Sequence, residues 1–196
     1  MSPLPNLSGG ALISECATYR YDLWRDWHTP MERELNLARC EARMGGVAEF
    51  VLWVMLNPST AAGLDSTGNL INDPTLRRCI GFTQRMGFRR LHLVNLYALR
   101  SSKPDALRKH VEPVGPDCDK WLRHHAERAS AIVVGWGGFD PQFLAPRVAQ
   151  VRELLSGKRL LCLNVNSDGS PQHPLFVPAH RDLVPWPHVE GASIAT

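Results

Sequence analysis

Two asparagines and a histidine lie in short segments at or after the ends of apolar runs of the chain. Asn57 lies in LNPSTA, Asn95 in LVNLYALR and His173 in QHPLFVP. A side-chain amide offers one acceptor and two donors, which can match the hydrogen-bonding edge of a base. The commoner alternative is structural, because a buried amide also bonds loop backbone and a lone histidine often lies in a surface turn. We therefore treat the three residues as candidates for ligand recognition.

Residues that flank these segments add hydroxyl, cationic and apolar groups. Pro58 turns the chain, and the hydroxyls of Ser59 and Thr60 follow it. Such a turn can hold a water or an anion, or its hydroxyls can satisfy their own backbone. Arg100 can meet a phosphate or be solvated, and Leu175 is either a core residue or an apolar wedge for a partner. These five residues complete the set of substrate-binding candidates.

A fourth segment, VVGWGG, contains Gly135, Gly137 and Gly138 and ends another apolar run. These glycines permit close approach of the backbone, but they do not complete a GxGxxG pattern, so we expect no dinucleotide site. We expect Trp136 to be a packing residue. A long polar loop after LNPSTA contributes further candidates, since loops of this length are often functional: Asp65, Asn69 and Asn72.

Apolar runs and helical periodicity predict the elements that position these residues. Short apolar runs predict buried strands, and apolar residues at helical spacing predict helices. Asp73 before Pro74 is a typical helix start. Alternating aromatic and charged residues predict an edge strand or hairpin at residues 17–27. The predicted strands cover residues 50–56, 90–97, 131–136 and 159–165, and the predicted helices cover residues 73–87, 117–129 and 141–155.

This strand–helix alternation predicts an α/β fold with three α/β/α layers around a central, mostly parallel four-stranded sheet, plus an N-terminal strand or hairpin addition. Ligands bind at the carboxyl ends of the strands in such sheets, so the polar segments should meet there. We expect a mobile N-terminus at residues 1–14, a single domain at residues 15–185 and a surface tail at residues 186–196. Within the domain, we expect a loop at residues 39–46.

The composition is that of an ordinary globular chain. It has 196 residues, 44% of them hydrophobic, and its 22 basic and 19 acidic side chains give a net charge of +3. That length suits one domain, and the charge permits a local basic patch without indicating a nucleic-acid binder. No apolar run is long enough to span a membrane and the N-terminus lacks a signal sequence, so we expect a cytoplasmic protein.

The cysteines and histidines match no metal-binding pattern. The 5 cysteines are widely spaced, without CxxC, and the 8 histidines form neither HExxH nor HxH. We therefore predict no metal, no cofactor and no disulfide framework. Cys79 and Cys162 lie in apolar patterns and are expected in the core. No cysteine lies at a strand-to-helix turn beside a histidine, which argues against a nucleophilic thiol.

Two family resemblances rest on these segments together. From YRYDLWRDW through MLNPSTA, NDPTLRRC, VNLYALR and HPLFVP, about residues 17–185, the chain resembles a bacterial and phage family known only as domain-of-unknown-function family 1643. More loosely, the order of the segments resembles the uracil-DNA glycosylase superfamily. That resemblance implies that Asn57 positions water, Asn95 reads the base, His173 stabilises the leaving base and Leu175 enters the duplex.

The chain also departs from the glycosylase pattern. Many of those enzymes carry Asp beside the proline of the first motif, whereas Asn57 resembles the mismatch-specific branch and cannot act as a general base. Asp65 or Asp73 would have to supply a carboxylate. Leu175 replaces the serine usual after His-Pro.

Three functions remain open from the sequence. The first is hydrolysis of the N-glycosidic bond of a modified or unusual base in DNA, which requires the base to leave the stack. The second is an enzyme that acts on free nucleotides or nucleosides. The third is a non-catalytic protein that binds nucleic acid or nucleotide. The expected partner is thus DNA or a nucleotide.

Overall fold

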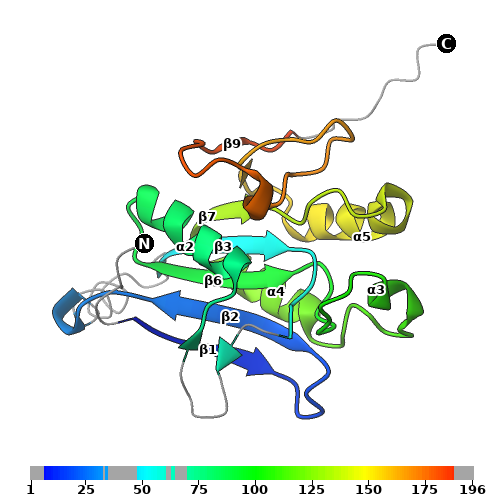
Figure 1. Ribbon diagram of the computed structural model, residues 1–196, viewed down its shortest axis with the longest axis horizontal. Coiled ribbons are helices and arrows are strands. Elements are labelled where there is room, and N and C mark those ends of the chain that lie inside the picture. Colours follow the sequence, from blue (N-terminus) through cyan, green and yellow to red (C-terminus); the bar gives the residue numbers. More distant parts are fainter. Residues whose placement is uncertain (1–6, 33, 35–47, 61–62, 65–69, 188–196) are drawn as a thin grey trace.

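A computed structural model describes residues 7–32, 34, 48–60, 63–64 and 70–187, and Figure 1 shows how their elements are arranged. A sheet of seven strands runs through the molecule in the order β1-β2-β6-β3-β7-β8-β9. The strands are β1 (Ser8–Ile13), β2 (Arg20–Asp26), β3 (Ala48–Met55), β6 (Arg90–Asn95), β7 (Ala129–Val134), β8 (Leu160–Cys162) and β9 (Val184–Pro185).

The strand directions are mixed. β3 pairs in parallel with β6 and with β7, and β7 pairs in parallel with β8. The pairs β1·β2, β2·β6 and β8·β9 are antiparallel. The α/β class is confirmed, whereas the expected sheet of four strands was too small, because strands join it at both edges.

Helices cover both faces of the sheet. Leu52 and Val54 of β3 pack in one core with helices α4 and α5, while Val51 and Trp53 pack in a second core with α2. The alternation follows from the pleat, which points successive side chains to opposite faces. The described helices are α2 (Pro74–Arg85), α3 (Ala106–Lys109), α4 (Cys118–Ala126), α5 (Pro141–Leu154) and the 3₁₀ helix η1 (Pro174–Phe176).

β1 lies inside the segment that we expected to be mobile. Its two glycines allow close packing on β2: a Cβ at Gly9 would lie 2.7 Å from the Arg25 side chain, and one at Gly10 would lie 2.9 Å from Trp24 Nε1. These glycines therefore allow β1 to pack closely against β2, although a glycine-containing segment suggests flexibility. Residues 1–6 lie outside the described residues.

The chain also continues into the fold at its C-terminal end. Trp186, which we assigned to a surface tail, is buried and packs edge-on against Trp136. The rest of that tail, at residues 188–196, and the loop expected at residues 39–46 lie outside the described residues. A short hairpin of β4 (Gly63–Leu64) and β5 (Leu70–Ile71) was not predicted.

The next two strands of the seven-stranded sheet after β3 along the chain, β6 and β7, lie on opposite sides of it. The connection after β3 leads through α2 to β6, and the connection after β6 leads through α4 to β7 on the other side of β3. Such a reversal opens a crevice at the carboxyl ends of the strands. None of the helices in the described part of the chain is long and apolar enough to cross a membrane.

Candidate functional site

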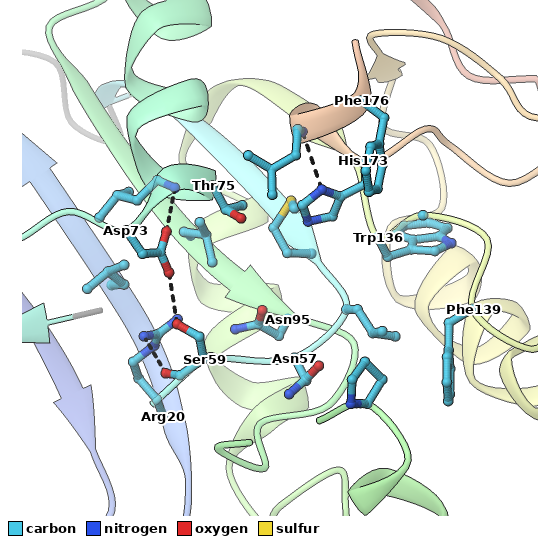
Figure 2. A pocket seen from close by; sticks show the side chains of 18 of the residues that line it. Arg20, Asn57, Ser59, Asp73, Thr75, Asn95, Trp136, Phe139, His173 and Phe176 are labelled. Atoms are coloured by element: carbon cyan, nitrogen blue, oxygen red, sulfur yellow. Dashed lines mark hydrogen bonds between the residues drawn. The ribbon is translucent and has the colours of Figure 1, made fainter. Parts of the chain in front are cut away.

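A pocket of about 410 Å³ lies at the carboxyl ends of β3, β6 and β7. Its apolar lining includes Met55, Leu93 and Trp136, together with Leu23 from β2. In the view of Figure 2, Arg20 and Asp73 lie at one end, Trp136 and Phe139 at the other, and Asn95 between them. Its polar and charged lining consists of Arg20, Asn57, Ser59, Asp73, Thr75, Asn95 and His173.

Asn95 ends β6 and is only 2% exposed. Neither its Oδ1 nor its Nδ2 has a hydrogen-bond partner among the described residues. Leaving a buried polar group unpaired costs on the order of 1–3 kcal/mol, so a native protein keeps such a group only where something else supplies the partner. The amide in the wall of the pocket therefore offers a donor and an acceptor to a polar ligand or a water.

Asn57 is held by the backbone that follows β6. Its Nδ2 donates to the carbonyl oxygens of Ser101 at 2.8 Å and Pro58 at 3.3 Å, with a longer contact to Leu99 at 3.5 Å. These acceptors fix the amide so that Nδ2 faces the loop. Within the described part of the chain nothing donates to Oδ1, which leaves this oxygen as an acceptor for a ligand or a water.

His173 precedes η1 and caps it. Its Nδ1 accepts a hydrogen bond from the backbone N–H of Leu175 at 3.3 Å. Burial lowers the pKa of His173 below its usual value, although the negative charge of Asp73 opposes the shift. A neutral imidazole whose Nδ1 accepts must carry its proton on Nε2. His173 is thus prepared to donate one hydrogen bond from Nε2.

Glycines of VVGWGG let the His-Pro loop approach the end of β7. A Cβ at Gly135 would lie 3.2 Å from the Pro174 ring, and one at Gly137 would lie 3.3 Å from the Cβ of His173. Gly137 also has a φ of +81°, which favours glycine. This segment therefore sets the position of His173.

Asp73 joins the pocket to the start of α2. Its Oδ1 accepts from the backbone N–H of Leu76 at 2.7 Å, as predicted for an N-cap, and its Oδ2 accepts from Ser59 Oγ at 2.8 Å. Arg20 Nη1 donates to the carbonyl oxygen of Ser59 at 3.4 Å. Burial lowers the pKa of Arg20 to about 10, so it stays cationic at neutral pH. The pocket thus carries both a carboxylate and a guanidinium.

The structure brings together five of the predicted site residues. Those that line the pocket are Asn57, Ser59, Asn95, His173 and Leu175.

Three others lie elsewhere. Pro58 is buried beside the pocket and Thr60 is exposed, and neither lines it. Arg100 does not line it either, because its Nη1 donates to the carbonyl oxygen of Ala17 at 2.8 Å. Of the loop candidates, Asn72 accepts a hydrogen bond from Arg25 Nε at 2.7 Å, while Asp65 and Asn69 lie outside the described residues.

Sequence reasoning missed Arg20, Thr75 and Phe139 in this pocket. Arg20 begins β2, for which the sequence predicts only an edge strand or hairpin, and nothing in its spacing relates it to Asn95. Thr75 lies in the first turn of α2, and its sequence context indicates only that a helix begins there. A signal did exist for Phe139, since it directly follows the glycines of VVGWGG.

One group of described side chains could hold a metal, although no spacing motif predicts it. Asp22, His92 and His125 are buried, and their ligand atoms lie within 4.8 Å of one another. His92 Nδ1 is 2.9 Å and His125 Nε2 is 3.3 Å from Asp22 Oδ2. Burial raises the pKa of Asp22, but its contacts with His125 and His92 outweigh this and lower it overall. None of the three lines the pocket.

The cysteines follow the prediction where they are described. Cys79, Cys118 and Cys162 are buried, and burial raises the pKa of Cys79 well above its usual value. Only Cys16 among the described thiols is exposed. None of the described cysteines lines the pocket, whose polar groups are amides, hydroxyls, an imidazole, a carboxylate and a guanidinium.

Comparison with known proteins places the chain in a family without assigning it an activity. No curated protein and no solved structure matches it. A family model described as "Protein of unknown function (DUF1643)" matches residues 20–175, which include the pocket residues Arg20, His173 and Leu175. The chain therefore belongs to the DUF1643 family of proteins of unknown function.

Proposed function

We propose that the pocket binds a nucleobase and that the protein hydrolyses the N-glycosidic bond of a modified or unusual base in DNA. The observation that carries this proposal is the unpaired amide of Asn95, buried in the pocket wall. A base edge presents adjacent donors and acceptors in one plane, which an amide matches with its own acceptor and donors. A base that pairs with Asn95 would relieve the cost of leaving the amide unpaired.

His173 supplies the group that stabilises the leaving base. Cleavage of the glycosidic bond leaves negative charge on the base and positive charge on the sugar. A preorganised donor directed at such charge is worth about 3–4 kcal/mol. The Nε2–H of a neutral imidazole is such a donor, and the hydrogen bond at Nδ1 holds the ring in place. His173 therefore takes the role of hydrogen-bond donor to a base oxygen or nitrogen.

Asn57 positions the attacking water, and Asp73 stabilises the sugar cation and accepts a proton from the water. With its Nδ2 bonded to backbone carbonyls, Asn57 presents Oδ1, which can accept a hydrogen bond from an attacking water. Asn57 cannot take up a proton, so the carboxylate of Asp73 in the same pocket supplies the negative charge. That carboxylate stabilises a cationic sugar and can accept the proton from water. Ser59 holds it through the hydrogen bond to Oδ2.

The arrangement of the sheet supports the same proposal. The pocket lies at the carboxyl ends of parallel strands beside β3, where the connections diverge. A uracil-DNA glycosylase-like fold would use that edge in the same way, with a strand-end asparagine on one strand and a His-Pro loop after another. This likeness is fold-level analogy, and the proposal therefore depends on Asn95, His173 and Asp73.

A second candidate is hydrolysis of a free nucleoside or nucleotide. The pocket volume of about 410 Å³ favours it, because this space falls in the usual range for sites of drug-sized ligands and exceeds the needs of one base. Arg20 at one end of the pocket offers a cation for a sugar or phosphate substituent. The residues that act on the base would be the same.

A substrate panel separates the two candidates. The protein is incubated with oligonucleotides that carry uracil, hydroxymethyluracil, hypoxanthine or mismatched thymine, and with the matching free nucleosides and nucleotides. Released base is measured by chromatography. Release from oligonucleotides alone supports the DNA substrate, and release from nucleosides or nucleotides alone supports the second candidate. No release from any member contradicts hydrolysis of these bases.

A further inference from the structure

A second hollow lies directly beside the pocket, along helix α2. This α2 groove, of about 820 Å³, is open to solvent. Leu175 lines both the groove and the pocket, so the two are separated by the start of η1. The α2 groove is lined chiefly by Arg77, Arg78, Gly81, Gln84, Arg85 and Leu175.

The groove is cationic. It contains three arginines, and no acidic side chain is among the described residues that line it. The helix that forms its floor, PTLRRCIGFTQR, contains no acidic residue. The whole chain carries a net charge of only +3, so this charge is concentrated locally. A local cationic stripe, more than net charge, marks a surface that binds polyanions.

Two of these arginines hold the His173 loop through neutral acceptors. Arg78 donates from Nε to the carbonyl oxygen of Pro174 at 3.2 Å and from Nη2 to that of Val177. Arg85 donates to the carbonyl oxygens of Ala179 at 2.7 Å and His180 at 2.9 Å. Carbonyl acceptors leave the cationic charge in place, so both guanidiniums still attract anions.

The arginines of the groove differ in whether an acidic side chain pairs with them. Arg85 also contacts Asp182, whose carboxylate is 93% exposed and only weakly neutralises it. Arg77 is exposed, and no described residue pairs with it. Arg77 is thus the most available cation of the groove.

The ridge between the pocket and the groove is apolar and exposed. Leu175 is 42% exposed and Phe176 is 75% exposed. Exposed apolar side chains between an aromatic pocket and a cationic groove suit the faces of unstacked bases, which stack on apolar and aromatic groups. Both residues also line the pocket, so a strand that enters the pocket from the groove would pass over them.

We propose that the α2 groove holds the sugar–phosphate backbone of a single DNA strand whose target base enters the pocket over the Leu175–Phe176 ridge. The inference rests on the proposed function for the identity of the base site. It assigns a polynucleotide as the substrate, because Arg77 lines the groove and not the pocket. The flanking phosphates of a strand would lie against Arg77, Arg78 and Arg85.

Gly81 provides a test that removes no existing contact. A Cβ built at this position meets nothing within 4 Å, and the residue lies within α2. Gly81→Glu therefore adds a negative charge to the groove without a clash, and Gly81→Gln adds the same volume without the charge. Both variants should fold, since replacing glycine inside a helix favours the helix.

The measurement is the fluorescence anisotropy of a labelled single-stranded oligonucleotide titrated with each protein. We expect the wild-type affinity to fall with salt, with a slope of roughly −0.7 per phosphate contact. Gly81→Glu should bind at least about tenfold more weakly than Gly81→Gln at low salt, because the two differ in charge and not in volume. Arg77→Ala should make the salt slope shallower by roughly 0.7, and Arg123→Ala, on α4, should leave it unchanged.

Other results would overturn the inference. Equal affinity of Gly81→Glu and Gly81→Gln would exclude a backbone in the groove, and so would wild-type binding that does not respond to salt. Failure of the proposed function gives a different pattern. If DNA binding follows the groove variants while no base is released, the groove assignment stands and the hydrolysis fails. If Gly81→Glu releases base from nucleosides and oligonucleotides at the wild-type rate, the groove assignment fails and the hydrolysis stands.

Discussion

The backbone N–H of Leu175 donates to Nδ1 of His173 at 3.3 Å, and this contact sets the chemistry of the imidazole. It assigns the proton of the neutral ring to Nε2 and fixes the ring at the start of η1. The same two residues border the pocket, so the residue that orients the histidine also forms part of the entrance. In the proposed reaction, recognition of the base and its release would therefore depend on a single turn of the chain.

Asn95→Leu is expected to stabilise the protein while it abolishes ligand binding. The substitution removes an amide that is buried without a partner, so the free energy of unfolding should rise by about 1–3 kcal/mol. Thermal unfolding is measured with and without millimolar base or nucleoside. Ligand should raise the Tm of the wild type and leave that of Asn95→Leu unchanged. A variant that is less stable by a similar amount would show that the amide has partners in the native protein.

Asp73→Asn separates the charge of the carboxylate from its capping role. Asparagine is as good an N-cap as aspartate, so the free energy of unfolding should change by less than about 1 kcal/mol. The rate of base release should fall by about 10² or more, because the charge that assists the water and the sugar is lost. Ser59→Ala, which keeps the charge, should have a smaller effect. Wild-type rates in Asp73→Asn would remove Asp73 from the mechanism.

Gly137→Ala is expected to lower base release through the position of His173. The added Cβ would lie 3.3 Å from that of His173, and the φ of +81° adds a backbone cost of about 1–2 kcal/mol. Gly157→Ala is the matched control, since Gly157 has a φ of +76° but nothing within 4 Å of its Cβ position. Both variants should lose similar stability, and only Gly137→Ala should lose activity. Equal losses of activity would mean that stability alone is responsible.

The protein is expected to lose stability as the pH falls below about 6.5, the ordinary histidine value. Burial lowers the pKa of both His92 and His173 in the folded state. Below that pH the unfolded chain binds more protons than the folded one, so acid favours unfolding. The lowered pKa of Asp22 adds a second loss below about 4.

Thermal unfolding followed from about pH 7.5 to about pH 5 measures the first loss. His92→Gln removes one titrating group and keeps a donor for Asp22, so its Tm should fall less steeply with acid. A wild-type Tm that stays constant over this interval would contradict the burial of both neutral imidazoles.

The sequence predicted the parts of the fold that have periodic patterns. Apolar runs placed β3, β6, β7 and β8, and Asp73-Pro74 placed the start of α2. The edges of the sheet had no such pattern, because β1 contains glycines that pack against β2 and β9 has only two residues. Their positions depend on tertiary pairing, which local spacing does not encode.

The sequence likewise predicted only part of the candidate site. Asn57 lies just after β3, Asn95 ends β6 and His173 lies in the loop after β8, so strand prediction placed them near one edge, and the structure has them in one pocket. Arg20 enters from β2, whose antiparallel pairing with β6 could not be read from local sequence. Arg100 also follows a strand end, but its hydrogen bond to Ala17 directs it to the β1–β2 turn. The direction in which a side chain points at a strand end therefore could not be predicted from the sequence.

The most direct test of the central claim compares base release by the wild type and by His173→Ala. The oligonucleotides that carry modified or mismatched bases are incubated with each protein under single-turnover conditions, and abasic sites are cleaved by alkali. We expect cleavage by the wild type on at least one substrate and a rate lower by about 10²–10³ in His173→Ala, the usual effect of removing one preorganised donor. Equal rates in the two proteins, or no cleavage by the wild type on any substrate, would contradict the proposed hydrolysis.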